Sequence, residues 1–152
     1  MAWSNSKVFG FSVLQVGQNV VKYSSDGYMV ALYASNTMTP DNTVATLALS
    51  SYNGAASQWI VANEVANGLG YTSGGASISP TSWMQSGGTV TFTSSGTPQW
   101  TVATFTTYGC LVYDDLVGNA GLSYNYFGGP QEVTAGTFSI AWSASGIASF
   151  ST

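Results

Sequence analysis

The side chains that could carry acid–base chemistry are few in this chain. It has six carboxylates and two lysines but no histidine, and histidine is the commonest general base. Asp114 and Asp115 are the one adjacent acidic pair, and in a strand they would point to opposite faces. A glycosidase needs two carboxylates that face each other across its substrate, and no local pattern supplies them. We therefore predict that the protein is not an enzyme. A glycan- or cell-wall-cleaving enzyme that uses Glu64 or Glu132 is the alternative from that class.

Metal-binding and cofactor-binding patterns are equally weak. Asp114, Asp115 and Asn119 offer oxygen ligands, but their spacing does not match a calcium-binding loop. The glycines between residues 68 and 75 resemble a phosphate-binding loop only superficially, because no lysine and no helix follow them. The single cysteine, Cys110, excludes an internal disulfide, and in a strand-like run we expect a buried, inert thiol. We expect no metal and no cofactor.

The charge content limits the kinds of partner. Charged residues make up only 5% of the chain, against roughly 25% in an average soluble protein, and solubility depends on charged groups. No apolar run approaches the ~20 residues of a membrane-spanning helix, and an aromatic content of 14% argues against disorder. Two lysines cannot neutralise a phosphate backbone. The composition therefore favours permanent burial in an assembly, with neither nucleic acid nor membrane as a partner.

The most distinctive local pattern is Gly68-Leu69-Gly70-Tyr71-Thr72-Ser73-Gly74-Gly75-Ala76-Ser77-Ile78. Its glycines permit backbone conformations that other residues avoid, and Tyr71 is its one aromatic residue. This pattern predicts an extended segment that a single aromatic side chain anchors.

The residues before Gly68 show signals of both strands and helices. Residues 1–25 are expected to form an N-terminal arm or extension, in which 7–16 are extended, or alternatively a short helix that Ser6 caps and that ends at Gly17. Residues 28–33 predict a strand buried on both faces, and 43–49 a strand or a helical turn. The one helix is expected within 55–67, between possible caps at Asn53 or Ser57 and a stop at Asn67-Gly68; a competing interpretation ends it near 60–62 and makes 63–67 extended.

The second half of the chain has the pattern of short antiparallel strands. Candidate strands are residues 76–79, 89–93, 98–105, 108–114, 121–127, 132–143 and 146–151, separated by turns at 87–88, 94–96, 117–119 and 128–130. From Phe138 to Trp142 large apolar residues alternate with small ones, which is typical of a strand buried on one face. We predict a mainly β fold, an antiparallel β-sandwich of jelly-roll or immunoglobulin-like type with one short helix, whose single domain spans residues 26–152.

Aromatic side chains are the candidates for binding. Those of Trp100, Phe105, Phe138 and Trp142 are expected in the core. Aromatic residues at an exposed position can act as assembly hot spots or as a platform for sugars. The residues that we predict at an intersubunit interface are Trp3, Phe9, Phe11, Trp59, Tyr71, Tyr124, Tyr126 and Phe127.

Several short motifs also resemble a family. Tyr28-Met29-Val30-Ala31-Leu32-Tyr33 followed by Thr39-Pro40-Asp41, then Gly70-Tyr71-Thr72-Ser73-Gly74-Gly75, Trp100-Thr101-Val102, Tyr108 to Tyr113 and Gly136 to Trp142 appear in this order. Over residues 26–150 the chain resembles small β-rich structural proteins of tailed bacteriophages, found as head decoration (minor capsid) proteins or in the tail and its fibres.

The resemblance implies a virion component without catalytic activity. The expected function is a capsid decoration protein that oligomerises, for example as a trimer, and cements subunits of the major capsid protein from the head surface. The alternative is a tail, tail-tip or fibre component, with glycan-binding aromatic residues at Tyr124–Phe127.

Overall fold

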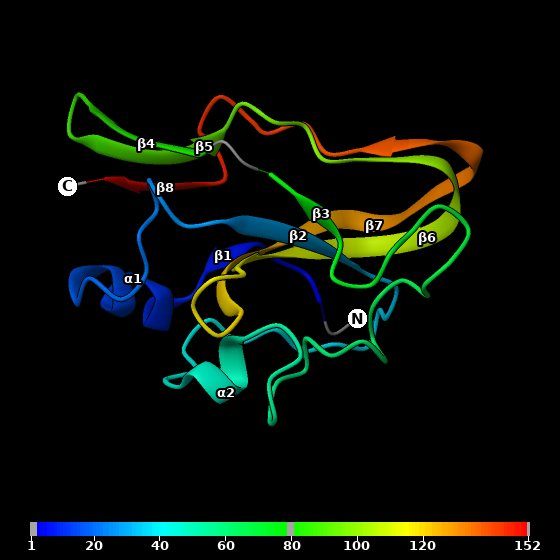
Figure 1. Ribbon diagram of the computed structural model, residues 1–152, viewed down its shortest axis with the longest axis horizontal. Coiled ribbons are helices and arrows are strands. Elements are labelled where there is room, and N and C mark those ends of the chain that lie inside the picture. The colour runs from blue at the N-terminus through cyan, green and yellow to red at the C-terminus, as the bar shows by residue number, and fades with distance from the viewer. Residues whose placement is uncertain (1–2, 79–80, 152) are drawn as a thin grey trace.

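The protein forms two antiparallel β-sheets in a computed structural model that describes residues 3–78 and 81–151. The larger sheet has the strand order β1-β7-β6-β2-β3, and the smaller one the order β4-β5-β8. Figure 1 shows the smaller sheet above the larger one, with α2 below. The elements are β1 (Lys7–Val8), α1 (Gly10–Gly17), β2 (Tyr28–Tyr33), α2 (Leu47–Ser50), β3 (Ala76–Ser77), β4 (Thr81–Ser86), β5 (Thr89–Ser94), β6 (Gln99–Asp114), β7 (Ala120–Ser139) and β8 (Ala148–Ser151). The predicted mainly β, antiparallel sandwich is confirmed.

The long hairpin of β6 and β7 builds much of both layers. Its two strands pair from Asp114↔Ala120 to Gln99↔Ser139, with several register shifts on the way. Figure 1 shows both strands curling at the right-hand end. The paired residues 99–107 of β6 and 131–139 of β7 thus lie above the paired residues 109–114 and 120–126. Irregularities of this kind bend a strand and increase its twist. The bent hairpin explains how one pair of strands can contribute to both sides of the core.

This hairpin corrects two predicted boundaries. Residues 98–105 and 108–114 are not separate strands, because β6 runs through both, and β7 runs through the predicted turn at 128–130. Gly128 and Gly129 have positive φ angles of 84° and 151°, so they bend β7 instead of reversing it. The turns at 87–88 and 117–119 are confirmed. β4 is not among the predicted strands, although the Gly87-Gly88 turn indicates a strand on each side.

The predicted helix within 55–67 is wrong, since these residues form turns. Pairing with the end of β2 competes with the helix: the N–H of Val65 donates to the carbonyl of Leu32 at 2.9 Å, and that of Ala34 to Asn63 at 3.1 Å. The helices are α1, which ends at Gly17 as the helical alternative for residues 7–16 predicted, and α2. The N-cap of α1 is Phe9 and makes no side-chain bond, so Ser6 is not the cap. Neither helix in the described residues is long and apolar enough to cross a membrane.

The larger sheet buries both of its faces, as its sequence predicts for β2. Val30 and Leu32 point into a core between the two layers, whereas Ala31 and Tyr33 point into a second core on the opposite face. Alternate residues of a strand face opposite sides, so the nearly continuous apolar run of β2 serves both cores. The loops around α2 lie below this second face in Figure 1.

The N-terminal segment is part of the domain and not a separate arm. β1 pairs with β7 through Lys7↔Tyr124 and Val8↔Ser123, and Trp3 and Phe9 are fully buried in the second core. The prediction that these two residues lie at an intersubunit interface on an N-terminal arm is wrong. Their large apolar area is covered within the chain, which stabilises the fold by roughly 1.5–3 kcal/mol per side chain.

Candidate functional site

Most of the aromatic residues predicted at an interface lie inside the molecule. Trp3, Phe9, Trp59, Tyr71 and Tyr124 are each at most 2% exposed. Four of them pack together: the ring of Trp59 has its centroid 5.4 Å from that of Trp3, 6.1 Å from Phe9 and 5.5 Å from Tyr124. The pairs with Trp3 and Phe9 are edge-to-face and that with Tyr124 is stacked, and aromatic pairs of both kinds add roughly 0.5–1.5 kcal/mol beyond the buried area. These five side chains hold the fold together and do not face a partner.

The remaining three predicted interface residues are half-buried: Phe11, Tyr126 and Phe127. Tyr126 packs against Trp3 with ring centroids 6.1 Å apart, and Phe127 packs against Phe138 at the same distance. Phe11 lies on α1. Only these three retain an exposed part that another molecule could contact.

Glu64 is the centre of a buried hydrogen-bond network. Its Oε1 accepts a bond from the hydroxyl of Tyr71 at 2.5 Å and one from the N–H of Gly74 at 2.8 Å, and its Oε2 accepts one from the hydroxyl of Tyr52 at 3.0 Å. The Tyr113 hydroxyl donates to the carbonyl of Gly74 at 2.8 Å. The network thus joins Glu64 to both ends of the segment 71–74 and confirms Tyr71 as its anchor. Glu64 is 5% exposed, and its carboxylate oxygens already accept three bonds, which leaves it little freedom to serve as a catalytic group.

A second acidic site lies where β2 begins and β6 ends. Asp114 is fully buried, and its Oδ1 accepts bonds from the N–H groups of Leu116 at 2.8 Å and Val117 at 3.1 Å. The pKa of Asp114 is raised to about 6, mainly by burial and also by the neighbouring carboxyl of Asp26, while the two N–H groups lower it. Its Oδ2 has no hydrogen-bond partner. The described residues contain no group of three or more His, Cys, Asp or Glu side chains that could hold a metal ion.

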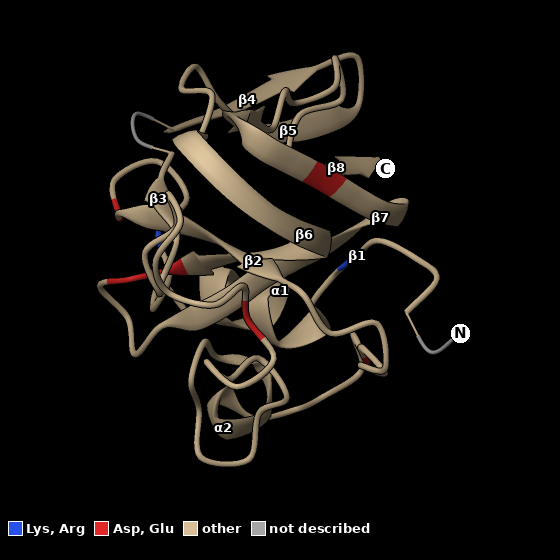
Figure 2. Cartoon of the chain, turned by 90° about the vertical axis from the view of Figure 1, so that its right-hand side faces the viewer, with Lys and Arg blue, Asp and Glu red and all other residues tan. Residues whose placement is uncertain are grey.

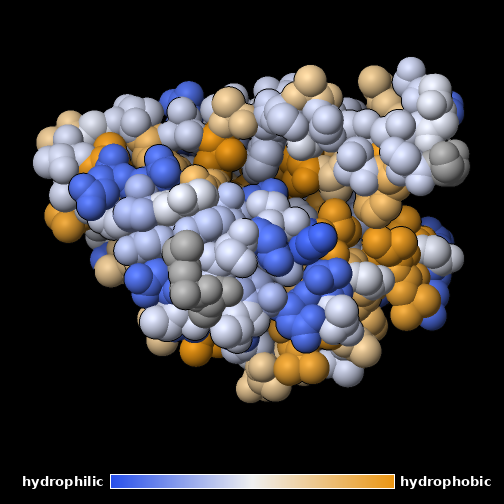
Figure 3. Space-filling view, turned by 180° about the vertical axis from the view of Figure 1, so that it is seen from behind, coloured by the Kyte–Doolittle hydropathy of each residue, from blue (hydrophilic) through white to orange (hydrophobic). Residues whose placement is uncertain are grey.

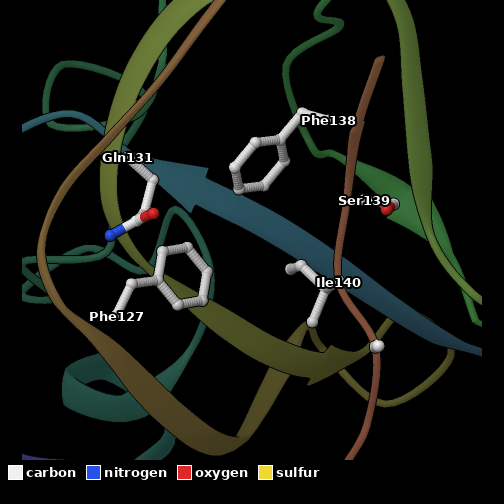
Figure 4. A pocket seen from close by; sticks show the side chains of 6 residues that line it. Phe127, Gln131, Phe138, Ser139 and Ile140 are labelled. Carbon is white, nitrogen blue, oxygen red and sulfur yellow. The ribbon is translucent and has the colours of Figure 1, made fainter.

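A groove runs between the two layers on the side where β7 bends. Three adjoining hollows of about 300, 250 and 250 Å³ share lining residues along it. Figure 4 shows Phe127, Phe138 and Ile140 of the first hollow pointing toward one another, with Gln131 beside them. Seen from behind, apolar residues reach the surface between the upper and lower layers (Figure 3). The groove therefore offers an elongated, mostly apolar surface with an amide group at one end.

Polar atoms without partners lie along the floor of this groove. Ser123 lines one hollow and Asn125 lines two, and neither the Oγ of Ser123 nor the Nδ2 of Asn125 has a hydrogen-bond partner. Cys110, opposite Asn125 in the β6–β7 ladder, is a free, buried thiol as predicted, and burial raises its pKa to about 12. Of the residues along this groove, the sequence indicated Phe127 but not Ser123, Asn125 or Ile140, because the bend that brings them together has no local sequence pattern.

The outer surface has more large apolar side chains than charged ones. Among the described residues only Lys7, Lys22, Asp41, Asp115 and Glu132 are exposed charged residues, and Figure 2 shows how widely they are scattered. The exposed large apolar residues are Val13, Leu14, Val20, Leu49, Val61, Leu69, Trp83, Met84, Val102 and Leu116. Ten exposed large apolar side chains thus stand against five exposed charged ones, whereas the solubility of a free monomer depends on a surface richer in charge.

Two of these apolar residues also adopt an unfavourable backbone conformation. Leu69 and Val102 have φ angles of 49° and 52°, and their side chains are 73% and 78% exposed. The N–H of Thr104 donates to the carbonyl of Leu69 at 2.9 Å, which holds the turn at Leu69 against β6. A β-branched residue with positive φ is a true outlier, and its cost of about 1–3 kcal/mol is not offset by burial of its own side chain.

Comparisons with protein-family models, with curated proteins and with solved structures find no match to this chain. The resemblance to phage structural proteins therefore depends on the sequence motifs alone.

Proposed function

We propose that this protein is a non-enzymatic structural component of a tailed-bacteriophage virion, a decoration protein that cements subunits of the major capsid protein on the head. The observation that carries the proposal is the excess of exposed large apolar residues over exposed charged residues. Neutral contact surfaces avoid the desolvation cost of burying ions, so a surface of this kind is suited to burial against neighbouring subunits.

The distribution of the apolar residues supports contact with more than one neighbour. Val13 and Leu14 lie on α1, Met84 lies on β4, and Leu69 lies in a turn beside the part of β6 that contains Val102. A cementing protein must touch several subunits at once, and separate apolar areas fit that geometry.

Labelling of intact virions tests the proposal. An antibody against this chain, detected by gold particles in electron microscopy, is expected to mark the heads of virions from the phage that encodes it. Particles from a deletion mutant are the control and should carry no label. An absence of label on intact virions would contradict the proposal. Deletion of the protein should also make the heads less stable to heat or to removal of salt.

A tail or fibre component that binds glycans is the second candidate, and the groove favours it. Phe127, Gln131 and Ser139 place an aromatic ring, an amide and a hydroxyl along one hollow of about 300 Å³, and sugars bind to such combinations. Phe127→Ala and Tyr126→Ala should then abolish binding to host-cell glycans, whereas Phe11→Ala should not. Label confined to tails would favour this candidate over the first.

A further inference from the structure

The edge of the smaller sheet offers a self-complementary pairing site. β4 is an edge strand in the order β4-β5-β8, six residues long, and its register with β5 is unbroken from Thr81↔Ser94 to Ser86↔Thr89. Proteins usually protect such edges with charged residues, prolines or bulges. β4 has none of these between Thr81 and Ser86, so its outer main-chain groups are free to pair with another strand.

The other long edge in the described residues is protected. β7 has only the two-residue β1 beside it, but its free stretch contains Gly128, Gly129, Pro130 and Glu132, which interrupt pairing. The outer half of β6, residues 99–108, lies beyond the end of β2, but register shifts and the positive φ of Val102 make it irregular. β1 and β3 have two residues each, and β8, the other edge of the smaller sheet, has four. β4 is therefore the edge at which strand addition meets the fewest obstacles.

The hairpin turn determines which groups of β4 point outward. Gly87 and Gly88 form a two-residue loop and both have positive φ, 54° and 79°, as in the turns that match the twist of a hairpin. In such a loop the flanking residues Ser86 and Thr89 form a hydrogen-bonded pair, and bonded and non-bonded pairs alternate from there. The main-chain groups of Met84 thus face β5, and those of Trp83 and Gln85 face away from it. In the part of the chain that the structure describes, neither of these two residues bonds outside its own sheet.

We propose that two copies of this chain pair through β4, antiparallel to each other, about a two-fold axis at Trp83. This register places Trp83 opposite Trp83 of the second copy as a hydrogen-bonded pair, and Thr81 opposite Gln85. It places Ser82 opposite Met84 as a non-bonded pair. The result is one continuous six-stranded sheet, since each copy contributes β8, β5 and β4. The inference rests on the assembly role proposed above and names one of its contacts.

The side chains on both faces suit this pairing. Trp83 points to the inner face, where its ring centroid lies 4.7 Å from that of Tyr23 and 5.6 Å from that of Phe150, yet it is 37% exposed. A second indole beside it would cover that part. Met84, 65% exposed, lies on the outer face and would pack over the short Ser82 of the other copy. β4, β5 and β8 contain no charged residue, so no like charges meet across the axis.

Disulfide cross-linking tests the register directly. The variants Ser82→Cys and Met84→Cys are purified separately and mixed in equal amounts under mild oxidation. Positions 82 and 84 of two copies would face each other as a non-bonded pair, with Cα atoms about 4.5 Å apart, within disulfide range. Two copies of one variant place their cysteines on a diagonal of about 7–8 Å, beyond that range. We therefore expect covalent dimers in the mixture and few or none in either variant alone.

Two controls separate the β4 edge from other contacts. A mixture of Ser149→Cys and Ser151→Cys tests the β8 edge in the same way, and we expect no cross-link because the edge that pairs is β4. Adding Gln85→Pro to the first mixture removes an outward N–H without touching the bonds to β5 and should abolish the cross-link. Circular dichroism checks that each variant is folded.

Each result decides the inference. Absence of cross-links in the mixture, or equal cross-linking in single variants, would overturn the pairing at Trp83. Failure here leaves the virion role standing if particles are labelled. Conversely, cross-linking of the purified protein together with unlabelled particles would leave the pairing and remove the virion role.

Discussion

The hydroxyl of Tyr71 lies 2.5 Å from Oε1 of Glu64 and also accepts the N–H of Leu32 at 2.9 Å. One side chain thus joins a buried carboxylate to the main chain of β2, 39 residues earlier. Desolvation by burial and the bond to Glu64 raise the pKa of Tyr71 well above its ordinary value. The hydroxyl therefore keeps its proton, and its bond to the carboxylate, at any pH up to the ordinary tyrosine pKa of 10.0.

We predict that Tyr71→Phe destabilises the fold by about 2–4 kcal/mol. The change leaves the N–H of Leu32 buried without an acceptor and removes a donor from a buried carboxylate, and each loss costs roughly 1–3 kcal/mol. Tyr52→Phe is the matched control, because Tyr52 donates to the same carboxylate from a half-buried position and should cost about 1 kcal/mol. Urea unfolding measures both, and equal effects of the two substitutions would contradict the role given to Tyr71.

Gly75 is predicted to tolerate no side chain, unlike Gly128. Their φ angles are nearly equal, 82° and 84°, so alanine pays a similar backbone penalty of roughly 1–2 kcal/mol at both positions. A Cβ at Gly75 would overlap the carbonyl group of Val30, whereas one at Gly128 meets nothing within 4 Å. We expect Gly75→Ala to lower the free energy of unfolding by at least ~2 kcal/mol more than Gly128→Ala. A smaller difference would mean that β2 and the glycine-rich segment can separate without cost.

Sequence patterns predicted the elements whose signal is local. Residues 28–33 formed the expected strand, and the glycine pair at 87–88 marked a real turn. The stretch 68–75, predicted to be extended, instead turns at 69–70 and 73–74. The helix expected at 55–67 failed because its residues are divided between partners far along the chain: Trp59 packs in the second core and Val65 in the first. Tertiary pairing of this kind overrides local propensity, and no pattern within 55–67 reports it.

Trp3 should contribute far more to stability than Phe11, although the sequence places both in the same N-terminal segment. Trp3 is fully buried, contacts Trp59, Tyr33 and Tyr124, and donates its indole N–H to the carbonyl of Asn5 at 3.2 Å. Trp3→Ala is expected to cost about 3–5 kcal/mol, and Phe11→Ala, from a half-buried position, about 1 kcal/mol or less. Thermal unfolding of both variants is the measurement. Similar small losses would restore the interpretation of residues 1–25 as a separate arm.

The candidate site was predictable only in part, for a related reason. Composition alone indicated an assembly surface, because the shortage of charge is visible without any fold. The residues that form the surface were assigned wrongly where large aromatic side chains were taken for contact points. Tyr124 alternates along β7 with Ser123 and Asn125, so its face could not be known until the second core on that side was known. The exposed residues are instead medium-sized, such as Met84 and Leu69, and nothing in their local sequence distinguishes them from core residues.

The stability of the protein should fall as pH rises through the pKa of Asp114, about 6. Burial and the Asp26 carboxyl raise this pKa above the ordinary value of 3.8, so between these two values the folded protein holds a proton that the unfolded chain releases. The stabilising effect of that proton is complete below about pH 4 and is lost as pH rises past 6.

Asp114→Asn keeps an oxygen for the N–H groups of Leu116 and Val117 and removes the buried charge. The free energy of unfolding of the variant, relative to that of the unsubstituted protein, should rise by on the order of 1–3 kcal/mol from about pH 4 to about pH 7.5. Urea unfolding at both pH values measures this change. Asp26→Asn should weaken the pH dependence without removing it, because burial is the larger cause. If the two proteins differ in free energy of unfolding by the same amount at both pH values, Asp114 is not protonated in the folded state.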